Sequence, residues 1–329
     1  MRDVGATLVV ALLPADAARK TGDHKGRPYS RQCWRAEQFD ATAPSARGAS
    51  IGEANLDERA FPFIRLNQRA TKPRQIGLTE IRGPYYAVMG TRYLSDILET
   101  VGEYVDGVKY AGGSFALMPR ARVREINDLA HKHHAYISTG GFIEHVLAHE
   151  GAGAVKRYLG ECQDLGFDVV ELSTGFITLP PDDLIALVKT VAQAGLKAKP
   201  ELGIQFGAGG ATAAAELAAE GTRDVRWVIG LASRCLDAGA ERIMIESEGI
   251  TESVTTWRTD AVAAIIDGLG LAPVMFEAAD PPVFEWYIKN YGAEVNLFVD
   301  HSQIVQLECL RAGLWGTKSS WGRITTYKP

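Results

Sequence analysis

The chain of 329 residues has the length of one large domain or two ordinary ones. Its 46% hydrophobic and 23% charged residues are typical of a soluble globular protein. The net charge of −5, without a clustered Lys/Arg stripe, argues against a nucleic-acid partner. No stretch approaches the roughly 20 apolar residues that span a bilayer, so we expect no membrane partner.

Residues 1–70 are expected to form an N-terminal extension that is partly irregular, before a barrel at 71–329. The first 20 residues resemble a weak secretory signal, but their apolar run is short, so a first strand or an irregular arm fits better. Cys33, Cys162, Cys235 and Cys309 are far apart and form no CxxC pair. This favours reduced thiols and a cytoplasmic location.

Short apolar runs alternate with amphipathic stretches from Lys72 onward. Strands are expected at 76–83, 107–113, 135–141, 168–175, 196–203, 242–249, 272–278 and 294–300. Helices are expected at 92–105, 119–134, 153–166, 180–195, 223–240, 257–270, 281–292 and 302–316, several of them ending in glycine. Eight strand–helix units predict an α/β fold, a (β/α)8 TIM barrel. A doubly wound sheet is the alternative, although its GxGxxG signature is missing.

Ionisable residues end nearly every predicted strand, and in such barrels the carboxyl ends of the strands form the active site. They are Glu80, Arg82, Lys109, Glu144, Glu171, Lys199, Glu201, Glu246, Glu248, Glu277, Asp300 and His301. A structural ion-pair network is the alternative explanation. The histidine-rich segment 131–134 ends a predicted helix and should lie at the opposite pole of the barrel.

The mixture of charges also indicates a ligand type. Clustered carboxylates favour a hard divalent cation such as Mg²⁺, and we expect Glu201, Glu246 and Glu277 to hold it. Glu248 would lie behind them or pair with a cation. Lysine and arginine suit a phosphate or carboxylate, and backbone N–H groups of the glycine pairs in "STGG" (138–141) and "AGGS" (111–114) suit an anion.

Several segments resemble the phosphosulfolactate synthase (ComA) family. They include "TKPRQIGLTEIRGP", "STGGFIEHV", "IMIESEGITES" and, most specifically, "VMFEAADPPVFEWYIKNYGAEVNLFVDHSQIVQLECLRAGLWGT". The resemblance spans residues 71–317 and is closer to the branch that contains plant heat-stress-associated proteins. It implies a (β/α)8 barrel, Mg²⁺ dependence, a homo-oligomer, and addition of sulfite to phosphoenolpyruvate to give phosphosulfolactate.

With that reaction in view, we expect a site for small anionic substrates, phosphoenolpyruvate with sulfite or another nucleophile. Lys109, Lys199 and Glu171 are the expected catalytic residues. The expected substrate-binding residues are Arg74, Arg82, Ser138, Gly140, Gly141, Asn296 and His301.

One departure from the family pattern concerns the fifth strand. Family members read roughly Glu-Val-Gly-Lys-Lys there, whereas this chain reads "ELGIQ", with Ile204 and Gln205 in place of the lysines. Two alternatives therefore stay open. The enzyme could use a phosphorylated enol acid with a nucleophile other than sulfite, or the barrel could be a non-catalytic stress-associated homologue.

Overall fold

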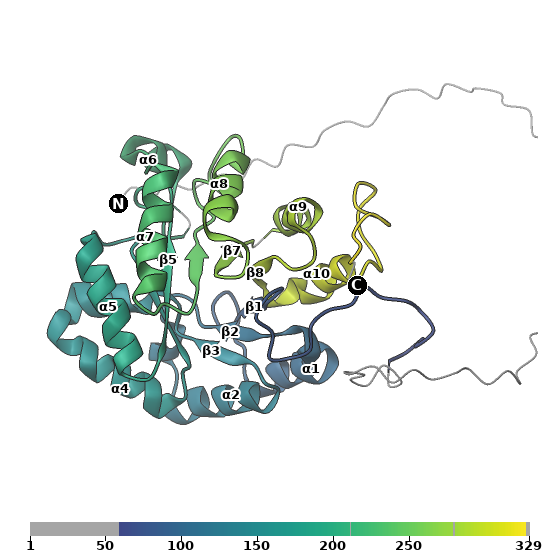
Figure 1. The fold of residues 1–329 in the computed structure, drawn as a ribbon. Coiled ribbons are helices and arrows are strands. Elements are labelled where there is room, and N and C mark those ends of the chain that lie inside the picture. Colours follow the sequence, from purple (N-terminus) through teal and green to yellow (C-terminus); the bar gives the residue numbers. More distant parts are fainter. Residues whose placement is uncertain (1–58, 211, 279, 327–329) are drawn as a thin grey trace, which may run out of the picture. The chain divides into compact units, whose positions relative to one another are not determined.

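A computed structural model describes residues 59–210, 212–278 and 280–326 and confirms the (β/α)8 barrel (Figure 1). Eight parallel strands close on themselves, because each pairs with the next and β8 pairs with β1. The strands are β1 (Thr79–Arg82), β2 (Gly107–Lys109), β3 (Tyr136–Ser138), β4 (Val169–Ser173), β5 (Lys197–Leu202), β6 (Ile243–Ile245), β7 (Val274–Glu277) and β8 (Asn296–Asp300).

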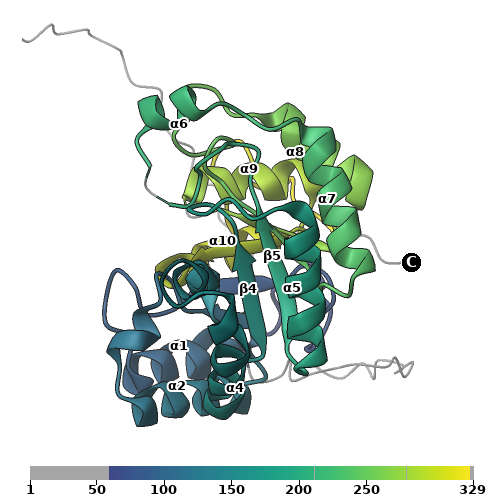
Figure 2. The same ribbon diagram turned by 90° about the vertical axis from the view of Figure 1, so that its left-hand side faces the viewer.

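Helices follow the strands and surround them (Figures 1 and 2). The helices that follow the successive strands are α1 (Thr91–Val101), α2 (Arg120–Lys132), α4 (Val155–Leu165), α5 (Pro181–Gln193), α7 (Val225–Asp237), α8 (Thr259–Leu269), α9 (Pro281–Tyr291) and α10 (Ile304–Arg311). Two short helices, α3 (Ile143–His145) and α6 (Ala214–Glu220), lie within connections. Helix α5 illustrates why such a segment forms a helix against the barrel. Pro181 begins it, and Leu184, Val188 and Val191 form its buried face.

The strands present apolar side chains to the helices and most of their charged side chains to the barrel interior. Since side chains alternate along a strand, Ile81 faces outward between Glu80 and Arg82. The outward residues join the helices in the main core. A separate apolar cluster of four residues lies inside the barrel: Leu78, Met244, Met275 and Phe298. Within the described residues, the space inside the barrel that this cluster does not fill is therefore available to charged side chains.

Arg311 joins the two ends of the barrel sheet. It is fully buried on α10, and its guanidinium donates hydrogen bonds to the carbonyls of Gly77, Leu78, Ala293 and Val295 at 2.6–3.3 Å. These carbonyls precede β1 and β8. Burial lowers the pKa of Arg311 to about 9. The guanidinium thus links the backbone before β1 to the backbone before β8, where the last strand pairs with the first.

The predicted extension, residues 1–70, lies mostly outside the described residues, as does Cys33. Its described part, residues 59–70, contains no helix or strand. The side chain of Asn67 nevertheless donates to the carbonyls of Arg311 and Ile324, which anchors this segment to the barrel. Within the described part of the chain, every helix is too short or too polar to traverse a bilayer.

The histidine-rich segment lies at the amino-terminal ends of the strands, as expected. His131 and His134 line a cavity of about 360 Å³ there, together with residues that precede or begin the strands. The Nε2 atom of His131 is 2.8 Å from a carboxylate oxygen of Asp168. The charged residues that end the strands therefore form a separate cluster at the other pole.

Candidate functional site

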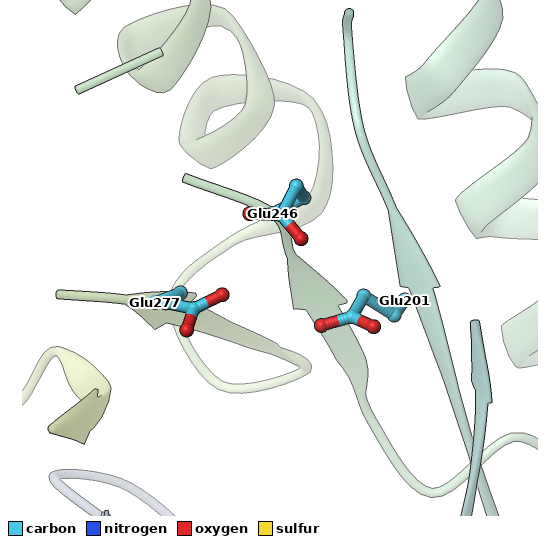
Figure 3. A group of neighbouring side chains, drawn as sticks. All are labelled: Glu201, Glu246 and Glu277. Carbon is cyan, nitrogen blue, oxygen red and sulfur yellow. The ribbon is translucent and has the colours of Figure 1, made fainter. Parts of the chain in front are cut away.

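Three glutamates from consecutive strands meet at the carboxyl end of the barrel (Figure 3). Glu201 lies on β5, Glu246 follows β6 directly, and Glu277 ends β7. Each offers a carboxylate oxygen, and these oxygens all lie within 4.8 Å of one another. The pairing of Leu202 with Ile245, and of Ile245 with Phe276, places the three strand ends at the same height. We call these residues the glutamate triad.

The three buried carboxylates of the triad all have raised pKa values, because their surroundings stabilise three negative charges poorly. Burial raises the pKa of Glu201 to about 7, and the charges of Glu171 and Glu277 add to this effect. Burial and the other two triad members raise the pKa of Glu246 well above its ordinary range. Burial also raises the pKa of Glu277, although Lys109 and Arg82 oppose it. An all-oxygen donor set with excess negative charge fits a hard divalent cation such as Mg²⁺.

A chain of alternating charges runs from the triad into the barrel. The Nζ atom of Lys109 is 3.4 Å from Glu201 and 2.7 Å from Glu171. The Nζ atom of Lys199 is 3.0 Å from Glu171 and 2.6 Å from Glu80. All four members below the triad are buried. The structure therefore brings together the three residues expected to be catalytic: Lys109, Lys199 and Glu171.

The pKa shifts of Lys109 and Glu171 favour the charged form of each group. Burial lowers the pKa of Lys109, but Glu171, Glu201 and other carboxylates outweigh it, so the pKa is raised well above the ordinary value. Burial raises the pKa of Glu171, but Lys109 and Lys199 outweigh it and the net shift is downward. Lys109 is thus an ammonium group that contacts the triad and also lies 4.4 Å from the ring centroid of Phe298.

Arg82 provides a second cation at the triad. Its guanidinium donates to Glu277 at 3.0 Å and lies between the rings of Tyr86 and Phe298, 4.9 and 5.1 Å from their centroids. His301 is close to this end of β1, because its Nδ1 atom is 3.0 Å from the carbonyl oxygen of Arg82. Arg82 is therefore well placed for an anionic substrate, whereas the contact of His301 fixes the backbone beside it.

The "STGG" segment also reaches the triad. Ser138 is fully buried, and its Oγ atom has no hydrogen-bond partner among the described residues. Gly140 has a φ of +61°, and a Cβ atom there would lie 2.1 Å from the carbonyl oxygen of Tyr110. A Cβ atom on Gly141 would lie 2.7 Å from the Cβ of Ser173 and 3.8 Å from Glu201. Only glycine allows this backbone to come so close.

Two residues expected to bind substrate lie at the wrong end of the barrel. Arg74 precedes β1 and donates to Ala70, Asp106 and Glu103 at 2.7–2.9 Å. Asn296 begins β8; its side chain accepts from the N–H of Leu78 and donates to the carbonyls of Leu271, Ala272 and Val274. Since both precede the middle of their strands, they belong to the amino-terminal pole. The structure therefore does not bring Arg74 and Asn296 together with the triad and the other residues expected to bind substrate.

Glu248 has a different environment from the one expected. No cation contacts it among the described residues. Its carboxylate accepts hydrogen bonds from the backbone N–H groups of Gly209, Gly210 and Thr212 at 2.8–3.2 Å. It therefore orders the loop after β5. Glu246 accepts the N–H of Glu248 at 3.0 Å, so the turn after β6 also orients a triad member.

The structure adds two residues that the sequence reading missed. Glu252 accepts from the hydroxyl of Ser247 at 2.6 Å, and its charge contributes to the raised pKa of Glu277. The repeated glutamates of "ESEGITES" could have indicated it. Phe298 faces inward between Arg82 and Lys109. The alternation of side chains along β8 could have placed it inside the barrel.

Gln205 occupies a position where the family resemblance led us to expect a lysine. Its Nε2 atom donates to the carbonyl of Leu217 at 2.5 Å and also to that of Gly221. Ile204 is buried in the main core between strands and helices. The side chain of Gln205 is thus engaged with the α6 connection and brings no positive charge to the site.

Comparison with known proteins gives the family. The model of the family described as (2R)-phospho-3-sulfolactate synthase (ComA) matches residues 67–317. The chain belongs to the phosphosulfolactate synthase family. The matched range covers the whole barrel described above.

The relatives within the phosphosulfolactate synthase family are of two kinds. The protein HEAT-STRESS-ASSOCIATED 32 of Arabidopsis thaliana is 40% identical over 259 residues, which cover 76% of this chain and 90% of that protein. The phosphosulfolactate synthase of Methanothermobacter thermautotrophicus is 26% identical over 264 residues, which cover 78% and 96%. The chain is therefore similar to a plant stress-associated protein as well as to archaeal enzymes.

The pKa of Glu201 predicts how stability changes with pH when no metal is present. The folded protein keeps a proton on Glu201 up to about pH 7, whereas the unfolded chain releases it near 4.5. Raising the pH from 4.5 to 7 should therefore reduce the contribution of Glu201 to the free energy of unfolding, by at most about 3 kcal/mol at 1.36 kcal/mol per pKa unit. Denaturant unfolding with a chelator at pH 5, 6 and 7 measures this. The Glu201→Gln variant should show a flatter dependence; an equally steep one would assign it to other groups.

Proposed function

We propose that this protein is a Mg²⁺-dependent lyase that forms a carbon–sulfur bond by adding a sulfur nucleophile to phosphoenolpyruvate, with sulfite as the first nucleophile to test. The observation that carries the proposal is the position of the Lys109 ammonium, 3.4 Å from one member of the glutamate triad. The proposed metal site and the proposed proton donor are then adjacent, as addition to the double bond of phosphoenolpyruvate requires.

The triad supplies the ligands in this proposal. Glu201, Glu246 and Glu277 would hold Mg²⁺, whose charge would stabilise the negative charge that develops on the substrate carboxylate. The fit rests on the all-oxygen donors, on their mutual approach within 4.8 Å, and on the raised pKa of Glu246. Mg²⁺ is usually bound by one or two carboxylates together with water and substrate oxygens, so one of the three glutamates could act through a bound water.

The remaining residues bind, orient and protonate the substrate. Sulfur attacks the methylene carbon, the double bond opens, and the neighbouring carbon takes a proton. Lys109 would donate that proton from its Nζ atom. Lys199 and Glu171 would keep Lys109 in place by the contacts described above. Arg82, the Ser138 hydroxyl and the backbone around Gly140 would hold the anionic groups.

A second candidate keeps phosphoenolpyruvate, or another phosphorylated enol acid, and changes the nucleophile. Gln205 favours it, because its amide is bound to two backbone carbonyls and brings no positive charge at a position where the resemblance led us to expect lysine. Sulfite and phosphoenolpyruvate are both anions, and bringing them together in a poorly solvated site needs compensating cations. A neutral nucleophile needs fewer of them.

An activity assay separates these candidates. The purified protein is incubated with Mg²⁺ and phosphoenolpyruvate, with sulfite or with thiols, and the loss of enol absorbance and the product mass are followed. We expect slow turnover with sulfite that the Gln205→Lys variant accelerates, because the variant restores a cation. Rapid phosphosulfolactate formation by the unaltered protein would instead favour sulfite as its natural nucleophile. If neither Mg²⁺ nor phosphoenolpyruvate binds, the enzymatic proposal fails.

A further inference from the structure

Large apolar side chains are exposed on the loops around the mouth of the barrel. Each of these loops follows the carboxyl end of a strand. Tyr86 and Val88, after β1, are 74% and 93% exposed; Leu117, after β2, is 92% exposed, and Phe176, after β4, is 67% exposed. Tyr85, after β1, and Phe206, after β5, are exposed to a smaller degree. We call these six residues the apolar rim. Soluble proteins usually scatter such residues singly.

Two members of the apolar rim, Tyr85 and Tyr86, are linked to the glutamate triad. The ring of Tyr86 lies 4.9 Å from the guanidinium carbon of Arg82, and Arg82 donates to Glu277 of the triad. The rings of Tyr85 and Tyr86 have centroids 4.8 Å apart. One series of contacts thus leads from a triad carboxylate through a cation to two aromatic rings. A ligand that binds at the triad and extends toward solvent on this side would meet these rings.

The rim is held in position by the same loops that build the site. A Cβ atom on Gly112, after β2, would lie 2.4 Å from the ring of Tyr85, so this glycine lets the ring pack on the β2 connection. The N–H of Phe176 donates to the carboxylate of Glu144 at 2.9 Å, which fixes the backbone at that aromatic residue. The exposed rings therefore project from anchored backbone.

If the substrates were only a three-carbon enol acid and sulfite, the apolar rim would remain exposed to water. Both are small and polar, and the triad, Lys109 and Arg82 can satisfy their charges. Apolar surface is stabilised when a ligand removes it from water. Gln205 adds no cation for a second anion. A neutral nucleophile with an apolar group satisfies both observations, because it needs no additional cation and covers the rings.

We propose that the nucleophile used at this site is a thiol that carries an aromatic or other apolar group, which packs on Tyr86 and Tyr85. This inference rests on the proposed function and specifies its nucleophile. The thiol sulfur bonds to the methylene carbon of the enol acid and its proton passes to solvent. The electrons of the opened double bond accept a proton from Lys109, which regains one from solvent, so that the thiol has added across the double bond with no other reactant.

Binding is measured first, without substrate, by saturation-transfer nuclear magnetic resonance. Benzyl mercaptan, an apolar thiol, is compared with 2-mercaptoethanol, a polar one. We expect benzyl mercaptan to bind at least tenfold more tightly, since burying an aromatic ring is worth a factor of roughly this size. The Tyr86→Ala variant should lose the difference. The Phe63→Ala variant, altered at an exposed aromatic residue before β1, should keep it.

Turnover is measured second, with Mg²⁺ and phosphoenolpyruvate, by the mass of the adduct. Faster addition of benzyl mercaptan than of sulfite, dependent on Tyr86, supports the inference. Equal affinity for both thiols, or a preference that survives Tyr86→Ala, overturns it. A sulfite adduct without binding of benzyl mercaptan overturns it and leaves the proposed function intact. Tyr86-dependent binding with no adduct from any nucleophile contradicts the proposed function and overturns the inference with it, because the bound thiol is then not a nucleophile.

The rim could also be covered by a second copy of the chain. In that case sedimentation velocity would show a concentration-dependent dimer that Tyr86→Ala weakens, and benzyl mercaptan would not bind. That result would overturn the inference, because the rings would not be accessible to substrate.

Discussion

Replacing Glu246 by glutamine should abolish stabilisation by Mg²⁺ while the protein stays folded. The substitution keeps the shape of the side chain and removes the charge that a hard cation needs. It also removes a buried carboxylate whose pKa is raised by burial and by two neighbouring glutamates. We therefore expect the metal-free variant to be at least as stable as the original protein. The measurement is a thermal melt with and without Mg²⁺, because a ligand of the folded state raises the melting temperature.

Glu241 offers a matched control for this experiment. It is an exposed glutamate at the amino-terminal pole, paired with Lys197 at 2.9 Å. Glu241→Gln should leave the Mg²⁺-dependent rise in melting temperature unchanged. If Glu246→Gln keeps the same Mg²⁺ affinity as the original protein in a calorimetric titration, Glu246 is not a ligand and the metal proposal for the triad has to be revised.

Replacing Lys109 by methionine should reduce turnover by roughly 10²–10⁴-fold, the usual contribution of a positioned general acid. Methionine keeps an apolar stem beside the ring of Phe298 but cannot donate a proton. Rates of product formation under saturating Mg²⁺ and phosphoenolpyruvate measure the effect. Lys197→Met is the control, because Lys197 is an exposed lysine at the other pole.

Loss of folding could imitate loss of catalysis in this variant, because Glu171 would lose one of its two lysine partners. Lys109→Arg addresses this point. Arginine keeps the positive charge beside Glu171, but its much higher pKa makes it a poor acid, so we expect a folded protein with low turnover. Turnover within about tenfold of the original in either variant, roughly 1.4 kcal/mol of barrier, would show that Lys109 is not the proton donor.

The barrel could be predicted from the sequence because its signal is local and repeated. Every predicted strand range contains an observed strand, and Gly166 and Gly292 cap α4 and α9 as expected, whereas Gly195 lies one residue beyond the cap of α5. The position of the glutamate triad could be predicted from the same alternation of strands and helices. Once the strands are parallel and consecutive, Glu201, Glu246 and Glu277 must come to neighbouring strand ends.

The errors concern residues whose height on the barrel depends on a few positions along a strand. Arg74 and Asn296 carry suitable chemistry, but both come before the middle of their strands and so belong to the other pole. The partners of Glu248 are backbone N–H groups of a loop about 38 residues away. Such contacts depend on how a loop folds back, which strand–helix alternation does not determine. For the same reason the engagement of Gln205 with the α6 connection could not be read from the pattern.

The burial of Arg311 has a consequence for synthesis of the chain. Its guanidinium binds the carbonyl of Gly77, 234 residues earlier, and carbonyls next to the last strand. A ribosome makes the first strand early and Arg311 close to the end. Until β8 has also emerged, the growing polypeptide has an open sheet with an unpaired edge at β1, although the whole glutamate triad has already been made. Such edges pair readily with other chains. Dependence on chaperones during translation should therefore be greatest just before β8 and the last helix are released from the exit tunnel.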